Sequence, residues 1–133
     1  MLTRLLTYPE NSNPENCLLA LKDNRENYFY GDVQVFGEYP EFIKKEWKKK
    51  GINVHFESGD EEILKLHTVD FVSFSYYMSF VSSVDAEKLE KVNGNVSTGV
   101  RNPYLKVTEW NWQIDPKGLH YSLIDMYDRY RKP

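Results

Sequence analysis

Val69-Asp70-Phe71-Val72-Ser73-Phe74-Ser75-Tyr76-Tyr77 is the stretch of this sequence that most clearly predicts a β-strand. β-branched and aromatic residues dominate it, and its apolar positions lack the three-to-four-residue spacing of a helix. Its nearly continuous apolar character is typical of a strand buried on both faces, as in a parallel sheet covered by helices. The stretch therefore favours an α/β fold.

Another strand and a helix are predicted near the N-terminus. The apolar run over residues 2–6 is followed by Tyr8-Pro9, as expected for a buried strand that leads into a loop. Asn13-Pro14-Glu15 then marks a helix start, with Asn13 as the capping residue. An irregular stretch is expected over residues 31–39. The apolar face of this helix is expected to contain Cys17, Leu18, Leu21, Tyr28 and Phe29.

Two shorter helices are predicted between the strands. The first begins at Pro40 and ends at Gly51, because glycine commonly follows the last turn of a helix. Its lysines are interpreted as a solvated face rather than a phosphate or nucleic-acid patch, since no glycine-rich loop interleaves them. Ser58-Gly59-Asp60-Glu61 resembles a capping box before a second helix over residues 63–66.

The region after the strand is predicted to be a long loop followed by a last helix. Turn residues are scattered over residues 78–113, and loops of that length within compact domains are usually functional. Asp115-Pro116 then predicts the cap and first residue of a helix. Its apolar face is expected to contain Leu119, Leu123, Met126, Tyr127 and Tyr130.

These elements form an incomplete architecture. Two parallel strands cannot close a barrel or cover both of their faces. The sequence stops at Pro133, after a helix and where a further buried strand is expected. We therefore expect a piece of a larger enzyme, whose exposed strand edges favour self-association.

Composition excludes several classes of function. The net charge is only −3, with acidic and basic residues mixed along the chain, so neither nucleic-acid binding nor membrane attachment is indicated. The one cysteine, Cys17, cannot form an internal disulfide, which favours a reducing, cytoplasmic compartment. His55, His67 and His120 lack metal-ligand spacing, so neither a metal nor another cofactor is expected.

Two stretches carry a family resemblance: residues 69–79, which extend the strand to Met78-Ser79, and residues 102–119, which contain Trp110-Asn111-Trp112-Gln113-Ile114-Asp115-Pro116. Both resemble family 1 glycoside hydrolases of the bacterial 6-phospho-β-glucosidase branch. Flanking motifs such as Tyr8-Pro9 and Arg25-Glu26-Asn27-Tyr28-Phe29 are similar in order and spacing. The resemblance runs nearly end to end.

The resemblance implies a (β/α)₈ TIM barrel whose active site lies at the C-terminal ends of the strands. Residues 1–133 would form a single partial-barrel fragment of the catalytic domain, covering the fifth and sixth βα units. The parent would be a retaining 6-phospho-β-glucosidase, which cleaves phosphorylated β-glucosides such as cellobiose 6-phosphate. The family's catalytic glutamates lie in Asn-Glu and Glu-Asn-Gly motifs, and neither motif occurs here. Since retaining hydrolysis needs both carboxyl groups, the resemblance implies an inactive fragment without catalytic residues.

Three positions match the family's substrate site. Tyr77 matches the tyrosine that orients the nucleophile, and Trp112 matches the platform for the aglycone. Ser75 stands where most members have asparagine, and it is expected to contribute to substrate binding. Alternatively, Tyr77 is a core aromatic residue at a strand end, and Trp110 is expected to pack nearby. Rival hypotheses are a carbohydrate-binding or interaction module that uses Trp110, Trp112 and Tyr77, and a truncated product without function.

Overall fold

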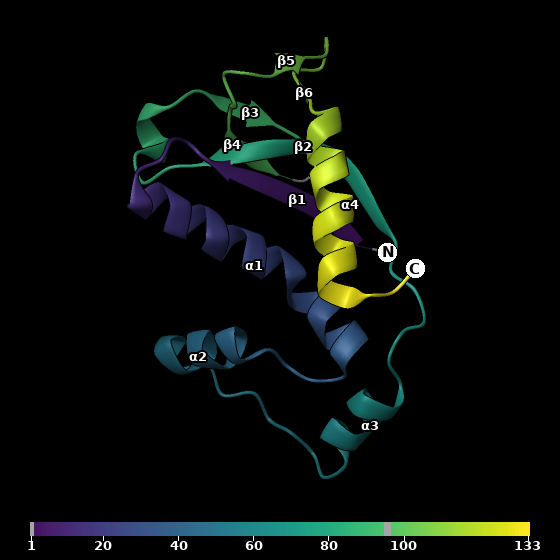
Figure 1. Ribbon diagram of the computed structural model, residues 1–133. Helices are drawn as coiled ribbons and strands as arrows, with labels where there is room; N and C mark the ends of the chain where they lie inside the picture. The colour runs from purple at the N-terminus through teal and green to yellow at the C-terminus, as the bar shows by residue number, and fades with distance from the viewer. Residues whose placement is uncertain (1, 95–96) are drawn as a thin grey trace.

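The computed structural model describes residues 2–94 and 97–133 and shows a mixed α/β fold (Figure 1). Its elements, in order, are β1 (Leu2–Pro9), α1 (Pro14–Phe36), α2 (Glu41–Lys50), α3 (Asp60–Leu66), β2 (Phe74–Ser82), the 3₁₀ turn η1 (Ala86–Lys88), β3 (Lys91–Asn93), β4 (Thr98–Val100), β5 (Lys106–Val107), β6 (Gln113–Ile114) and α4 (Pro116–Tyr130). Along the chain, α1, α2 and α3 separate β1 from β2, as the sequence predicts.

The two long strands are neighbours and run parallel, which confirms the predicted pair. Leu2 lies opposite Phe74, and Pro9 lies opposite Ser82. Two short strands extend the sheet in antiparallel orientation, giving the order β1-β2-β4-β3. The prediction of an irregular region over residues 78–113 is therefore wrong. Besides β3 and β4, this region contains the antiparallel pair β5-β6. Strands of two or three residues are too short for an alternating pattern to reveal them.

β2 begins five residues later than predicted. The preceding residues leave the sheet, because the Val69 amide donates to the carbonyl of Gln34, and the Val72 amide to that of Pro133. Val69 and Val72 pack instead against a core cluster of α1 and α4 residues. Burial beneath helices and burial within a sheet select the same apolar residues, which explains the error.

The long helix α1 continues through the stretch expected to be irregular. It ends at Gly37, whose left-handed backbone, with φ 68°, stops the helix. The predicted apolar face is mostly wrong, because Leu18 is 66% exposed and Leu21 55% exposed, although Tyr28 is buried. The face turned to the strands carries polar residues: the Asn24 side-chain amide donates to the carbonyl of Thr7 over 2.8 Å.

For two of the other three helices, the predicted capping residue is confirmed. Gly51 ends α2 with φ 67°, and the Asp115 carboxylate accepts from the Gly118 amide at the start of α4, both as predicted. The proposed capping box is wrong, because Gly59 caps α3 without a side-chain hydrogen bond, and the carboxylate that bonds there is that of Asp60, which accepts the amide of Glu57 over 2.8 Å. The buried face of α4 also differs from the predicted one and comprises Gly118, Ser122, Met126 and Tyr130.

The C-terminal halves of α1 and α4 are joined by a buried ion pair. The Arg129 guanidinium donates two hydrogen bonds to the Asp32 carboxylate, from Nε to Oδ1 over 2.6 Å and from Nη2 to Oδ2 over 2.5 Å. Tyr130 donates its hydroxyl to Asp32 Oδ1 over 3.0 Å. Asp32 is 1% exposed, so the fork of Arg129 fixes the two helices against each other.

Candidate functional site around Tyr77 and Trp112

A β-bulge interrupts the pairing of β1 and β2 close to the predicted site. Arg4 lies opposite Tyr76, whereas Leu6 lies opposite Ser79, so β2 contains one residue more than β1 in this interval. In a regular strand, residues three apart point to opposite faces, yet Tyr76 and Ser79 both donate to the same Asp115 carboxylate oxygen. The bulge therefore reorients the chain at Tyr77.

The structure brings Tyr77 and Trp112 together. Their ring centroids lie 5.8 Å apart in an edge-to-face arrangement. Tyr77 is 53% exposed, whereas the next residue, Met78, is buried in a cluster against which Trp112 packs. Ser75 is half-buried and precedes Tyr77 by two residues, just before the bulge.

Trp110 extends this aromatic group outward. Its ring centroid lies 5.9 Å from that of Trp112, and the residue is 76% exposed, so the expectation that it is a packing residue is wrong. Asn111 between the two tryptophans has φ 63°, and Thr108 Oγ1 accepts from both tryptophan amides. A tight turn thus places Trp110 beside Trp112, which in turn contacts Tyr77.

A buried carboxylate behind the aromatic group was predicted only as a helix cap. Oδ2 of Asp115 accepts hydrogen bonds from Tyr8 Oη over 3.0 Å, Tyr76 Oη over 3.3 Å and Ser79 Oγ over 2.5 Å. Oδ1 accepts the amide of Gly118 over 2.8 Å. Burial is the largest cause that raises the pKa of Tyr8 and of Tyr76, and the negative charge of Asp115 adds to it.

Gln113 is a second buried connection that sequence reasoning missed. Its side-chain Nε2 donates to the carbonyl of Ser79 over 2.5 Å, and its Oε1 accepts the amide of Asn102 over 2.6 Å. Gln113 is 1% exposed, and a buried glutamine whose groups are satisfied fixes its surroundings. It therefore ties the segment that carries Trp112 to β2. A polar residue next to a tryptophan in the sequence gives no signal for this role.

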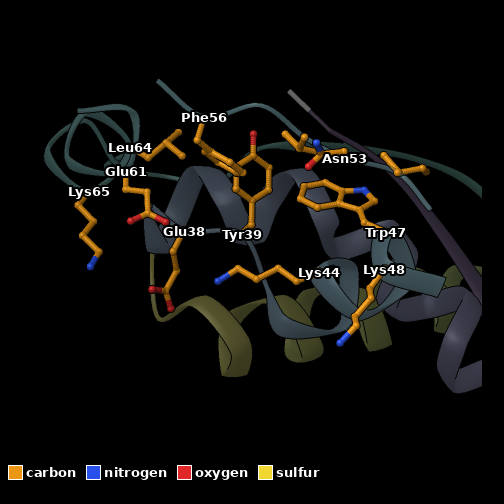
Figure 2. Close-up of a pocket in the computed structure, with 13 residues that line it drawn as sticks. Glu38, Tyr39, Lys44, Trp47, Lys48, Asn53, Phe56, Glu61, Leu64 and Lys65 are labelled. Carbon is orange, nitrogen blue, oxygen red and sulfur yellow. The ribbon is translucent and has the colours of Figure 1, made fainter. Parts of the chain in front are cut away.

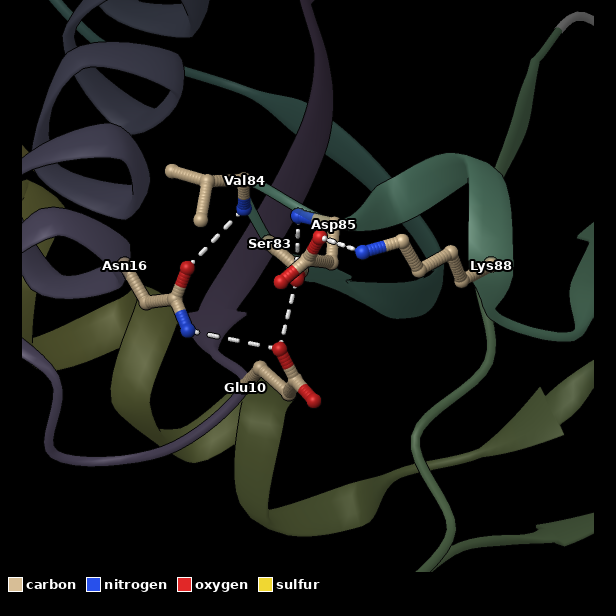
Figure 3. Close-up of polar contacts among 6 residues, drawn as sticks. All are labelled: Glu10, Asn16, Ser83, Val84, Asp85 and Lys88. Atoms are coloured by element: carbon tan, nitrogen blue, oxygen red, sulfur yellow. Dashed lines mark hydrogen bonds and ion pairs between the residues drawn. The ribbon is translucent and has the colours of Figure 1, made fainter.

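Further polar contacts fix the loops that follow β1 and β2 (Figure 3). Glu10 Oε2 accepts from Ser83 Oγ over 2.5 Å and from the Asn16 side-chain amide over 3.3 Å. Asn16 also accepts the amide of Val84 over 2.9 Å. These bonds join the residues that follow β1 and β2 to the first turn of α1, and they hold the carboxyl ends of the parallel strands in place.

A separate cavity of about 390 Å³ lies between α2 and α3. Figure 2 shows the aromatic side chains of Tyr39, Trp47 and Phe56 there, with Lys44 and Glu61 among the charged groups around them. None of the predicted site residues lines it, and in Figure 1 the helices α2 and α3 lie at the other end of the molecule from β5 and β6. The predicted site is therefore an open aromatic wall and does not coincide with this cavity.

Residues 2–94 and 97–133 contain neither a candidate metal cluster nor a membrane-spanning helix. Within these ranges no group of three or more His, Cys, Asp or Glu side chains could hold a metal ion. No helix in the same ranges is both long enough and apolar enough to cross a membrane.

Comparison with known proteins gives one consistent family. The family model of "Glycosyl hydrolase family 1" matches residues 1–133. The aryl-phospho-β-D-glucosidase BglH of Bacillus subtilis is 49% identical over 133 residues, and the 6-phospho-β-glucosidase of Dickeya chrysanthemi is 47% identical over 133 residues. Each match covers 100% of this chain but 28% of the relative. The chain thus spans little more than a quarter of these relatives.

Solved structures show the same fold. The psychrophilic β-glucosidase BglU of Micrococcus antarcticus superposes with a TM-score of 0.74 at 21% identity, covering 98% of this chain and 31% of that chain. A family 1 β-glucosidase of Thermotoga maritima gives 0.71 at 20% identity, covering 98% and 28% respectively. The arrangement of helices around β1 and β2 is therefore that of one part of the TIM-barrel fold.

Proposed function

This chain belongs to glycosyl hydrolase family 1, and on that premise we propose that it is one part of a retaining 6-phospho-β-glucosidase. The whole enzyme would hydrolyse phosphorylated β-glucosides, such as cellobiose 6-phosphate, to glucose 6-phosphate and an aglycone. The full-length family match and relatives named for phosphorylated glucosides support this substrate class. Residues 1–133 would be a single partial-barrel segment of its catalytic domain.

The contact between Tyr77 and Trp112 is the observation on which the proposed site depends. Tyr77 would donate its hydroxyl to the nucleophilic carboxylate and favour the charged form of that group. Trp112 would offer an aromatic face to the aglycone, and Ser75 would border the sugar on the same side of β2. The exposure of Tyr77 and its edge-on contact with Trp112 suit these roles.

The chain by itself should bind without catalysing. It contains neither an Asn-Glu dipeptide nor a Glu-Asn-Gly tripeptide, and retaining hydrolysis requires two carboxyl groups about 5–5.5 Å apart. Residues 1–133 would supply one wall of the substrate site, and the reactive carboxylates would come from other parts of the enzyme. Binding by one wall is expected to be weak.

Titration of the chain with phenyl 6-phospho-β-glucoside, followed by tryptophan fluorescence, tests this proposal. Trp112→Ala should weaken binding about tenfold, because loss of the aromatic face removes on the order of 1.4 kcal/mol. Trp47→Ala is the matched control, since Trp47 lines the separate cavity between α2 and α3. Turnover of the glucoside by the chain alone, or unchanged affinity after Trp112→Ala, would contradict the proposal.

A non-catalytic carbohydrate-binding module is the second candidate, and the 76% exposure of Trp110 favours it. The same titration separates the two candidates. Tight binding by the isolated chain that is equally strong for sugars without a phosphate would favour the module. Weak binding that requires Trp112 would favour a wall of the hydrolase site.

Two further properties belong to the proposal. In the described part of the chain, β1 forms one edge of its sheet, so its outer backbone groups can pair with another strand. The isolated chain is therefore expected to self-associate, and a monodisperse monomer by light scattering would contradict this.

We expect the enzyme to act in the cytoplasm, since Cys17 is free. A form secreted with a cleaved leader would contradict this location.

A further inference from the structure

One carboxylate connects both sides of the aromatic wall. Asp115 follows β6, which lies directly after Trp112, and its Oδ2 accepts hydroxyls from both strands of the parallel pair. Two of its donors, Tyr76 and Ser79, flank the bulge that contains Tyr77. These bonds connect Asp115 to β2 on both sides of Tyr77.

We propose that Asp115 is a positioning residue, whose carboxylate selects the bulged register of β2 and thereby sets Tyr77 against Trp112. The functional meaning of this inference rests on the proposed function, because the Tyr77–Trp112 wall serves a sugar site only if that site exists. The positioning itself concerns the fold and can be tested separately.

The register argument follows from the alternation of side chains along a strand. Without the extra residue, Tyr76 and Ser79 would point to opposite faces, and one of them would lose its bond to Asp115. Ser79 is fully buried, so its hydroxyl would then lack an acceptor in the interior. The shared acceptor makes the bulged register the satisfied one.

A second connection limits what loss of Asp115 can do. Gln113 still holds the Ser79 carbonyl through its side-chain amide. Removal of the carboxylate should therefore loosen the contact between Tyr77 and Trp112 without releasing the whole segment. This distinguishes a positioning residue from a residue on which the entire fold depends.

The simpler explanation is that Asp115 only caps α4, and its two oxygens allow the two roles to be separated. Oδ1 receives the Gly118 amide, whereas Oδ2 receives the three hydroxyls. Serine is as good a cap as aspartate, but its single oxygen cannot also serve three hydroxyl donors. Asp115→Ser therefore retains the cap and removes the shared acceptor.

The test compares the full 133-residue chain with Asp115→Ser by NMR and circular dichroism. We expect the cross-relaxation signal between the Tyr77 and Trp112 rings to fall below half of its original intensity, while helix content stays unchanged. Asp128→Ser is the matched control, because Asp128 lies on α4 and pairs with Arg131 at the surface. An undiminished ring signal in Asp115→Ser would overturn the proposal.

Ser79→Ala keeps the test decisive if Asp115→Ser fails to fold. It removes one hydroxyl and leaves the carboxylate and the cap, so a smaller decrease of the same ring signal is expected. An unchanged signal in a folded Ser79→Ala chain would also overturn the proposal. If the ring signal depends on Asp115 but the chain binds no glucoside, the positioning stands and the proposed function fails.

Discussion

Gly99 shows how strictly single residues are constrained in the short strands. A Cβ at this position would lie 2.3 Å from the Phe80 ring, which is packed in the cluster with Met78 and Val92. The ring of Phe80 thus occupies the space above β4 that any side chain at residue 99 would need. A glycine in a strand commonly marks such a close approach.

Gly99→Ala should lower the free energy of unfolding by about 1–3 kcal/mol, because β4 must move away from β2 or Phe80 must leave its rotamer. Urea denaturation followed by fluorescence measures this. Thr98→Ala is the control on the same strand, and its exposed side chain should change stability by no more than about 0.5 kcal/mol. Equal stability of the Gly99→Ala and Thr98→Ala chains would refute the packing argument.

Single residues could be predicted from the sequence where their role is local. Asn13, Gly51 and Asp115 all act as predicted at helix ends, since capping depends on neighbours within a few residues. The hydroxyl donors of Asp115 come from residues 36 to 107 positions away, so no local pattern could reveal them. Tyr77 and Trp112 were found only through the family resemblance, and their contact needed the structure.

At the scale of elements, the starts of α1 and α4 were predictable, whereas the buried face of α1 was not. Leu18 and Leu21 on α1 are exposed, whereas Asn16 and Asp32 of the same helix are buried. Hydrophobic periodicity assumes that apolar side chains face the core. Here hydrogen bonds to the strand ends and an ion pair to α4 satisfy polar side chains on that face, and the pattern misleads.

Arg129→Leu tests the connection between α1 and α4. It should lower the free energy of unfolding by about 2–4 kcal/mol, because it leaves the buried Asp32 carboxylate without its cation. The estimate is below the full range for buried pairs, since the Arg129 side chain is 32% exposed and water can partly replace it. Arg131→Leu breaks an exposed pair and should cost less than about 1 kcal/mol. Equal losses in the two variants by urea denaturation would contradict the buried-pair argument.

For the whole molecule, the parallel pair and its helical connection were predictable, because long strands and capped helices carry strong patterns. The antiparallel additions were not, since β3 to β6 contain only two or three residues each. The aromatic wall depends on these short strands: β6 begins at Gln113, next to Trp112, and β4 packs beside Phe80. The part of the fold that positions Trp112 is thus the part with the weakest sequence signal.

Tyr8, Tyr76 and Tyr130, whose pKa values are raised in the folded chain, predict how the stability of the whole molecule depends on pH. Burial is the largest cause that raises the pKa of Tyr8, Tyr76 and Tyr130 above the ordinary value of 10.0, and Asp115 or Asp32 adds to it. Above pH 10 the unfolded chain releases these protons while the folded chain keeps them, so the unfolded state binds fewer protons. The contribution of these tyrosines to the free energy of unfolding should therefore be constant below pH 10 and should fall as the pH rises further. Urea denaturation at a series of alkaline pH values measures how steeply the free energy of unfolding falls with pH. Tyr8→Phe should make this slope shallower. An equal slope in both chains would show that Tyr8 is not among the groups responsible.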